Sequence, residues 1–227
     1  MTLIGREQSI WAILFWRSVG MVPVLLGVIW WTSGGRVVAA VGSVGMAGVL
    51  GGLGLVVAFA GAIFALETTT VANAVLLFAA SPFVAALLGW MLLRERVRPA
   101  TWAGIALAAL GMGLMVRDGI SGGALLGNVA ALLSAVGFGA FSVALRWGRV
   151  GDMLPAVLLG AVFSCVVAGV ALLVLAEPMV PPLRDIGLAA AIGAGIVALG
   201  MVLYTAGSKV VPAAELTLLS LVEVILG

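Results

Sequence analysis

Apolar residues run through this chain in eight long segments, separated by short connections that hold most of the charged residues. None of the segments alternates between apolar and polar residues, as a half-buried strand would. A backbone inside lipid must satisfy its own hydrogen bonds, and segments of this length do so as helices. The pattern therefore predicts eight helical spans. They cover residues 10–31, 37–66, 69–93, 102–116, 124–145, 153–176, 186–207 and 212–227.

The composition identifies lipid as the solvent for most of these segments. Of the 227 residues, 64% are hydrophobic and 9% are charged, whereas a soluble domain is about half apolar and about a quarter charged. So few charged residues cannot cover a water-exposed surface. We therefore expect an all-α fold, a polytopic membrane helix bundle whose immediate partner is the lipid bilayer.

Lysine and arginine are distributed unequally between the two sets of alternate connections. One set holds Arg36, Arg94, Arg96, Arg98, Arg146, Arg149 and Lys209. The other set holds Arg6, Arg117 and Arg184, offset by Glu7, Glu67, Asp118, Glu177 and Asp185. Connections rich in Lys and Arg stay in the cytoplasm, so the first set predicts the cytoplasmic side of a multi-pass protein in the cytoplasmic (inner) membrane. The net charge of +2 then reflects loop positioning, and no nucleic-acid partner is expected.

Both ends of the chain conflict with this orientation. It places Met1 outside the cell although Arg6 precedes the first span, and a preceding helix would remove the conflict. The last segment, from Pro212 to Gly227, extends about 24 Å as a helix, less than the ~30 Å of a bilayer core. We therefore expect the chain to be trimmed at both ends relative to a complete protein of this kind.

Two segments far apart in the chain are similar to each other. TVANAVLLFAASP (Thr70–Pro82) can be aligned with PAAELTLLSLVEV (Pro212–Val224), since both open on small residues after a loop and continue through a leucine pair. The segments that precede them each carry an aromatic residue near the same place. An odd number of spans between related elements gives the two copies opposite orientations, as in the inverted repeats of secondary transporters.

The longest family resemblance covers FALETTTVANAVLLFAASPFVAALLGWMLLRERVRPATWAGIALAALGMGLMV (Phe64–Val116). Its small-polar loop, its Ser-Pro break at Ser81 and its acidic-basic loop resemble the EamA domain of the drug/metabolite transporter (DMT) superfamily. GNVAALLSAVGFGAFSVALRW (Gly127–Trp147) is similar to the sixth span of that family, and VEVILG (Val222–Gly227) to the start of its ninth. SIWAILFWRSVG (Ser9–Gly20) resembles the second span.

The resemblance implies ten helices arranged as two inverted five-helix repeats. Residues 1–121 would form the first repeat without its first span, and residues 122–227 the second repeat without its last span, so that about eight spans are present. Val224 departs from the family pattern, which usually has Pro after the glutamate, and this weakens the case for a kink in the last helix.

The resemblance also implies a function. The family moves small molecules, so we expect a secondary transporter that exports or exchanges a small metabolite, an amino acid or related compound, by alternating access. The alternative is a truncated, non-transporting membrane remnant of such a protein.

Glu223 is the sharpest candidate for a substrate or coupling residue. It lies about eight residues, or ~12 Å, along the helix from Glu215, at a depth where a charge costs about 2.5–3.5 kcal/mol on insertion scales. Glu223 therefore faces a cavity or a partner, or is protonated, because burial favours the neutral carboxyl. Two interpretations stay open: a site for a coupling proton or a substrate amine, and a structural hydrogen bond to a neighbouring helix.

Five further residues are candidates to line a substrate site. Arg17, about seven residues into its span, either snorkels toward the outer interface or contacts a substrate carboxylate in a cavity. Asn73, Ser81 and Ser220 offer hydrogen-bonding groups that either bind a substrate or hold helices together. Tyr204 either lines a cavity wall or packs in the core.

The residues needed for most enzyme chemistry are missing from the sequence. Histidine is absent and Cys165 is the one cysteine, and the sequence contains neither metal-ligand spacing nor a nucleophile elbow. We therefore expect no enzyme activity, metal or cofactor. Gly48 and Gly52 have a small-xxx-small spacing, which predicts close helix packing.

Overall fold

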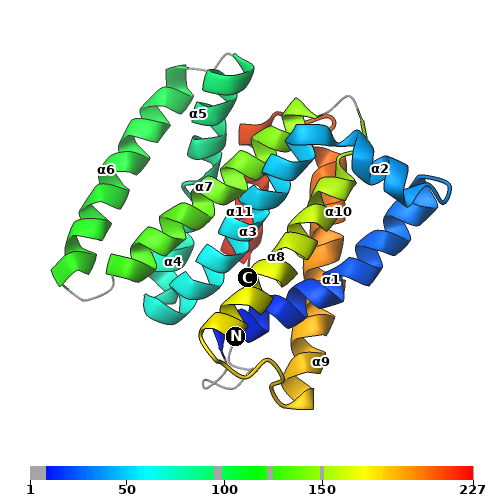
Figure 1. Ribbon diagram of the computed structural model, residues 1–227. Helices are drawn as coiled ribbons and strands as arrows, with labels where there is room; N and C mark the ends of the chain where they lie inside the picture. The colour runs from blue at the N-terminus through cyan, green and yellow to red at the C-terminus, as the bar shows by residue number, and fades with distance from the viewer. Residues whose placement is uncertain (1–8, 95–98, 122–124, 149–150, 227) are drawn as a thin grey trace.

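The computed structural model describes residues 9–94, 99–121, 125–148 and 151–226. Within these residues every regular element is a helix (Figure 1), which confirms the all-α class. The elements are α1 (Ile10–Thr32), α2 (Val37–Ser43), α3 (Gly45–Thr68), α4 (Val71–Phe78), α5 (Ser81–Leu93), α6 (Pro99–Ser121), α7 (Leu125–Trp147), α8 (Leu154–Val174), α9 (Leu183–Ile192), the π-helical turn η1 (Gly193–Val197), α10 (Ala198–Gly207) and α11 (Ala213–Leu226).

Each of the eight segments predicted from hydropathy contains helix. In the described part of the chain, six helices or helix pairs are long and apolar enough to cross a membrane. The remaining two segments are α6, whose apolar stretch is Trp102–Gly111, and α11, which has 14 residues. The structure thus supports an integral, multi-pass membrane protein, although it does not confirm the predicted count of eight spans.

Three of the predicted spans are interrupted. Gly45 separates α2 from α3 with a φ of +52°, a conformation that glycine adopts without strain. Pro82 is the second residue of α5; it lacks an N–H, and its ring clashes with the carbonyl four residues earlier, so α4 ends at Phe78. This confirms the predicted Ser-Pro break. The third interruption is the π-helical turn Gly193–Val197 between α9 and α10.

Helix α3 lies between α7 and α8, and glycines set both contacts (Figure 1). A Cβ added to Gly54 would lie 2.8 Å from the carbonyl oxygen of Gly137, and one added to Gly137 would lie 2.5 Å from that of Gly54. The backbones of α3 and α7 therefore touch. Toward α8, a Cβ on Gly52 would lie 3.0 Å from the amide nitrogen of Gly160, which confirms the predicted close packing at Gly52.

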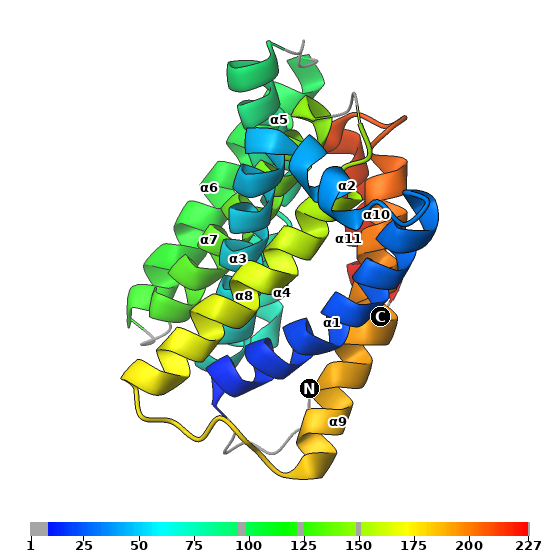
Figure 2. The ribbon, with the colours of Figure 1, turned by 45° about the vertical axis from the view of Figure 1, so that its right-hand side comes forward.

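Helix α1 crosses the bundle between α8 and the continuous segment α9–η1–α10 (Figure 2). A Cβ on Gly20 would collide with the backbone of Ala190, and one on Gly193 would collide with the carbonyl oxygen of Arg17. This contact is therefore also backbone against backbone. It fixes α1 relative to η1 at the position of Arg17.

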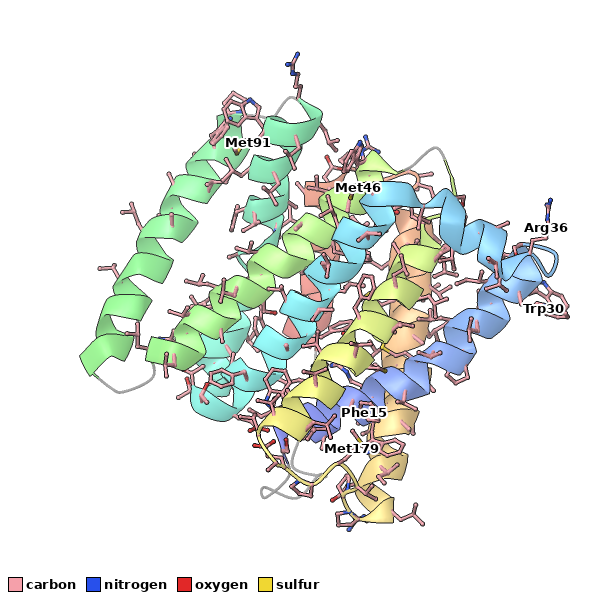
Figure 3. The ribbon with its side chains drawn as sticks, in the orientation of Figure 1. Phe15, Trp30, Arg36, Met46, Met91 and Met179 are labelled. Atoms are coloured by element: carbon pink, nitrogen blue, oxygen red, sulfur yellow. The ribbon has the colours of Figure 1, made fainter. Side chains whose placement is uncertain are left out.

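Charged residues gather at the two ends of the bundle. In the sequence, Arg36, Arg94, Arg146 and Lys209 lie at or just after the ends of α1, α5, α7 and α10. These helix ends point upward in Figure 1, and we call them the basic end. Figure 3 shows Arg36 and Met91 toward this end and Met179 toward the other. That other end, the acidic end, holds the described residues Glu67, Glu177, Arg184 and Asp185.

Replacing Gly137 with Ala should destabilise the protein by about 1–3 kcal/mol, because the new methyl group overlaps the α3 backbone and forces the helices apart. Unfolding in detergent micelles, followed by the loss of helical circular dichroism, measures the change. Gly200→Ala is the matched control, since nothing lies within 4 Å of a Cβ at Gly200. It should leave the stability unchanged or raise it by up to about 1 kcal/mol. Equal stabilities of the two variants would contradict the glycine contact.

Candidate functional site

Arg17 projects from α1 into the bundle interior. Its guanidinium carbon lies 4.4 Å from the centroid of the Phe59 ring on α3, a cation–π contact. Its Nε and Nη2 atoms are buried and have no hydrogen-bond partner in the described part of the chain. The side chain therefore does not snorkel to the interface with these atoms, and they remain available as buried cationic donors.

Two contacts hold α1 in the orientation that directs Arg17 inward. The indole Nε1 of Trp16, the preceding residue, donates to the carbonyl oxygen of Met179 at 2.9 Å. At the start of the same helix, the Ser9 hydroxyl donates to Oε2 of Glu177. Both acceptors belong to the connection between α8 and α9, so this connection prevents rotation of α1.

Two serines add further buried hydroxyl groups on the helices around Arg17. Ser18 on α1 and Ser164 on α8 are both fully buried, and neither Oγ has a hydrogen-bond partner among the described residues. Helices α1 and α8 pack along each other. Buried polar groups are normally satisfied by protein, water or a ligand, so each of these two hydroxyl groups is open to such a partner. The sequence reasoning had not identified Ser18, Ser164 or Phe59.

Tyr204 on α10 forms a second polar feature with Ser142 on α7. Their hydroxyl oxygens are 2.6 Å apart and buried. The Ser142 hydroxyl donates its hydrogen to the carbonyl oxygen of Phe138 at 2.8 Å, so Tyr204 is the donor in the pair. The Tyr204 ring packs against Phe138 and Phe141, with centroid separations of 5.1 and 6.0 Å. Tyr204 thus combines core packing with an interior hydrogen bond.

The other predicted site residues are more scattered. Asn73 is in the first turn of α4, where its backbone N–H donates to the Thr70 hydroxyl. Ser81 is buried at the start of α5, and the Ser220 hydroxyl donates to the Thr217 carbonyl oxygen of its own helix at 2.7 Å. Glu223 belongs to α11, but its side chain lies outside the described residues. Arg17 and Tyr204 are therefore the predicted residues that the structure places in the interior with functional groups directed at other helices.

Asn128 is a polar residue that the sequence reasoning missed. It is fully buried near the start of α7, where its Oδ1 accepts a hydrogen bond from the Thr69 hydroxyl at 2.8 Å. Its Nδ2 is unpartnered among the described residues. Asn128 joins α7 to the end of α3 at the acidic end, and an Asn within an apolar run is the signal that could have found it.

The open edge of Arg17 favours a planar anion. Nε and Nη2 lie on the same edge of the guanidinium plane, and two parallel N–H groups of this kind bind a carboxylate in a bidentate manner. Metal chemistry has no comparable basis in the described part of the chain, where no three His, Cys, Asp or Glu side chains could hold an ion together.

Comparisons with known proteins bear on the fold and the family of the chain. A family model described as "EamA-like transporter family" matches residues 1–117, just over half of the chain. A solved structure titled "Crystal structure of protein" aligns with a TM-score of 0.65 and 24% sequence identity, over 96% of this chain and 76% of that chain. At this identity the likeness supports the fold alone. A search of curated proteins found no match.

The fold and the family match together define a multi-pass membrane transporter of the DMT type. The chain belongs to the EamA-like transporter family, as the resemblance of its third and fourth segments predicted.

Ser142→Ala should destabilise the protein more than Tyr204→Phe does. In Tyr204→Phe, Ser142 keeps its bond to Phe138, so the loss is that of one hydrogen bond, about 1 kcal/mol. In Ser142→Ala, the Tyr204 hydroxyl stays buried without its acceptor, which costs about 1–3 kcal/mol. Unfolding in detergent measures both changes. The double variant should be no less stable than Ser142→Ala, and the opposite order of the single variants would refute Tyr204 as the donor.

Proposed function

We propose that this protein is a secondary transporter of the cytoplasmic membrane that exports or exchanges a small metabolite by alternating access. Membership of the EamA-like transporter family supports transport rather than catalysis. The observation that carries the substrate assignment is the buried, unpartnered edge of Arg17 among the membrane-crossing helices.

The proposed substrate carries a carboxylate, as an amino acid or a related compound does. Desolvation makes an unpaired buried cation costly, and a bound anion with good geometry offsets that cost. The Arg17 edge supplies two charge-assisted hydrogen bonds for a carboxylate. Ser18, adjacent in the sequence, and Ser164 on α8 supply hydroxyl groups for other polar atoms of the substrate.

Alternating access would use two inverted repeats, residues 1–121 and 122–227. If α1 corresponds to α8, then α2–α3 corresponds to α9–α10, and α4–α5 to α11. The packing fits this correspondence. The contact of α3 with α8 has its counterpart in the contact of the α9–η1 segment with α1. The corresponding helices α1 and α8 contact each other, and so do α5 and α11. Elements related by a two-fold axis meet each other near that axis, where transporter sites form between the repeats.

Glu223 is the proposed coupling residue, which would carry a proton or bind a substrate amine. A carboxyl group in the interior of a membrane helix is costly when charged, so it takes up a proton readily as its surroundings dry. Helix α11, which carries it, packs against α5 and α7. Alternate hydration of Glu223 from the two sides would couple proton movement to substrate movement.

Arg17→Gln should lower the flux of carboxylate substrates at least tenfold, because it removes two charge-assisted hydrogen bonds of about 1.5–3 kcal/mol each. Efflux of a mixture of radiolabelled amino acids from proteoliposomes measures this. Arg17→Lys keeps the charge without the bidentate geometry and should retain an intermediate flux. Arg36→Gln, an exposed arginine at the basic end, is the control and should retain full flux. Unchanged flux in Arg17→Gln would refute the carboxylate site, whereas no flux in the unaltered protein would refute amino acid transport.

Glu223→Gln should abolish proton-driven flux, since the amide cannot release a proton at any physiological pH. The measurement is substrate flux in vesicles with and without an imposed pH gradient. Glu215→Gln is the matched control, because Glu215 is an exposed residue in the first turn of the same helix. If the pH gradient drove as much substrate flux through Glu223→Gln as through the control, the coupling assignment would be wrong.

A further inference from the structure

An apolar groove lies on the bundle surface where α3, α5 and α7 meet. Its volume is about 350 Å³, and no residue of the Arg17 site lines it. The lining residues are Leu50, Leu53, Gly54, Val57, Leu88, Leu92, Val136, Gly137, Ala140, Val143, Ala144 and Trp147. Without a charged or hydrogen-bonding side chain except the Trp147 indole, this surface cannot recognise a polar metabolite.

The groove is a consequence of the glycine contact between α3 and α7. Gly54 and Gly137 form part of its lining and have no side chains to fill the space above the crossing. Around them, Leu53, Val57 and Leu92 are exposed. The helices that form the walls are all membrane-crossing segments, so the groove opens toward lipid acyl chains.

The apolar groove suits a hydrocarbon chain. Its volume is about 350 Å³ and its lining offers mainly aliphatic side chains. A hydrocarbon chain needs no polar partner and is narrow enough to lie in such a groove.

One end of the groove reaches the basic end of the bundle. Trp147 directly follows Arg146 on α7, and Leu92 precedes Arg94 by two residues at the end of α5. Tryptophan is enriched at the membrane–water interface, which is where the phosphate of a lipid lies when its acyl chain occupies the groove.

We propose that this groove binds an anionic phospholipid. One acyl chain lies against α3, α5 and α7, and Arg94, at the end of α5 next to the groove, holds the negatively charged headgroup. Basic residues at the cytoplasmic ends of membrane helices bind anionic headgroups, and each contributes about fivefold in affinity near the membrane surface. This site is separate from the proposed transport site and does not depend on what is transported.

Native mass spectrometry of the detergent-purified full chain tests the proposal. The probes are phosphatidylglycerol and phosphatidylcholine with the same palmitoyl and oleoyl chains. The unaltered protein should bind the first phosphatidylglycerol at least fivefold more tightly than phosphatidylcholine. Equal binding of the two lipids would overturn the proposed headgroup recognition.

Two variants separate the acyl-chain contact from the headgroup contact. Ala140→Phe fills the groove and should lower the binding affinity for both lipids at least fivefold. Arg94→Asn should lower the affinity for phosphatidylglycerol about fivefold and leave the affinity for phosphatidylcholine unchanged. Asparagine is chosen because it tolerates the left-handed backbone of Arg94. The matched controls are Ala206→Phe, at an exposed position of α10, and Arg36→Asn, an exposed arginine on the basic end. Neither control should change lipid binding.

A second measurement leaves the groove unfilled, so its result does not depend on whether Ala140→Phe folds. Brominated phosphatidylglycerol should quench tryptophan fluorescence in the unaltered protein at low mole fraction and to saturation. Trp147→Phe should lose that saturable component. Quenching that only follows the bulk lipid fraction in both proteins would overturn the proposal. So would a dimer that Ala140→Phe dissociates without changing lipid binding, because the occupant would then be a second copy of the chain.

Discussion

The close approach of α3 to α7 at Gly54 and Gly137 determines where the rest of the bundle lies. Inside a membrane, burial of apolar surface gives little drive for helices to associate, and close van der Waals packing takes its place. Once these backbones touch, Phe138 lies against Tyr204 and Phe59 lies beneath the Arg17 guanidinium. The same crossing leaves the surface groove above the two glycines. Packing, the polar interior and the groove therefore have one origin.

The interior position of Arg17 is expensive, and the structure offsets only part of the cost. An arginine in a membrane helix costs about 2.5–3.5 kcal/mol on insertion scales, while a desolvated cation–π contact returns about 2 kcal/mol. Helix α1 cannot rotate the side chain toward water, because Trp16 is bonded to Met179 and Gly193 lies against the Arg17 backbone. These contacts keep the unpartnered Nε and Nη2 atoms of Arg17 inside the bundle.

Much of the fold could be predicted from the sequence, because lipid requires long apolar helices and proline interrupts them. The break at Ser81 and Pro82 and the close packing at Gly52 follow from local chemistry. The inward faces could not be predicted, since these helices are apolar all round and the pattern does not show which side is buried. Ser18 and Ser164 were missed for that reason. Among the predicted candidates, Arg17 and Tyr204 project into the interior, whereas Ser220 bonds to its own helix.

The π-helical turn η1 connects the two polar features of the interior. A π turn holds one residue more than an α turn, and each residue of a helix advances the facing direction by about 100°. The extra residue at Gly193–Val197 therefore rotates all of α10 by about that angle relative to α9. Helix α9 packs on α1, and α10 carries Tyr204 to Ser142 on α7. Without the extra residue, Tyr204 would be turned by about 100° from its present direction toward α7 while α9 still contacted α1. Since Gly193 also lies on the Arg17 backbone, a change in the winding of η1 would act on both Arg17 and Tyr204 together.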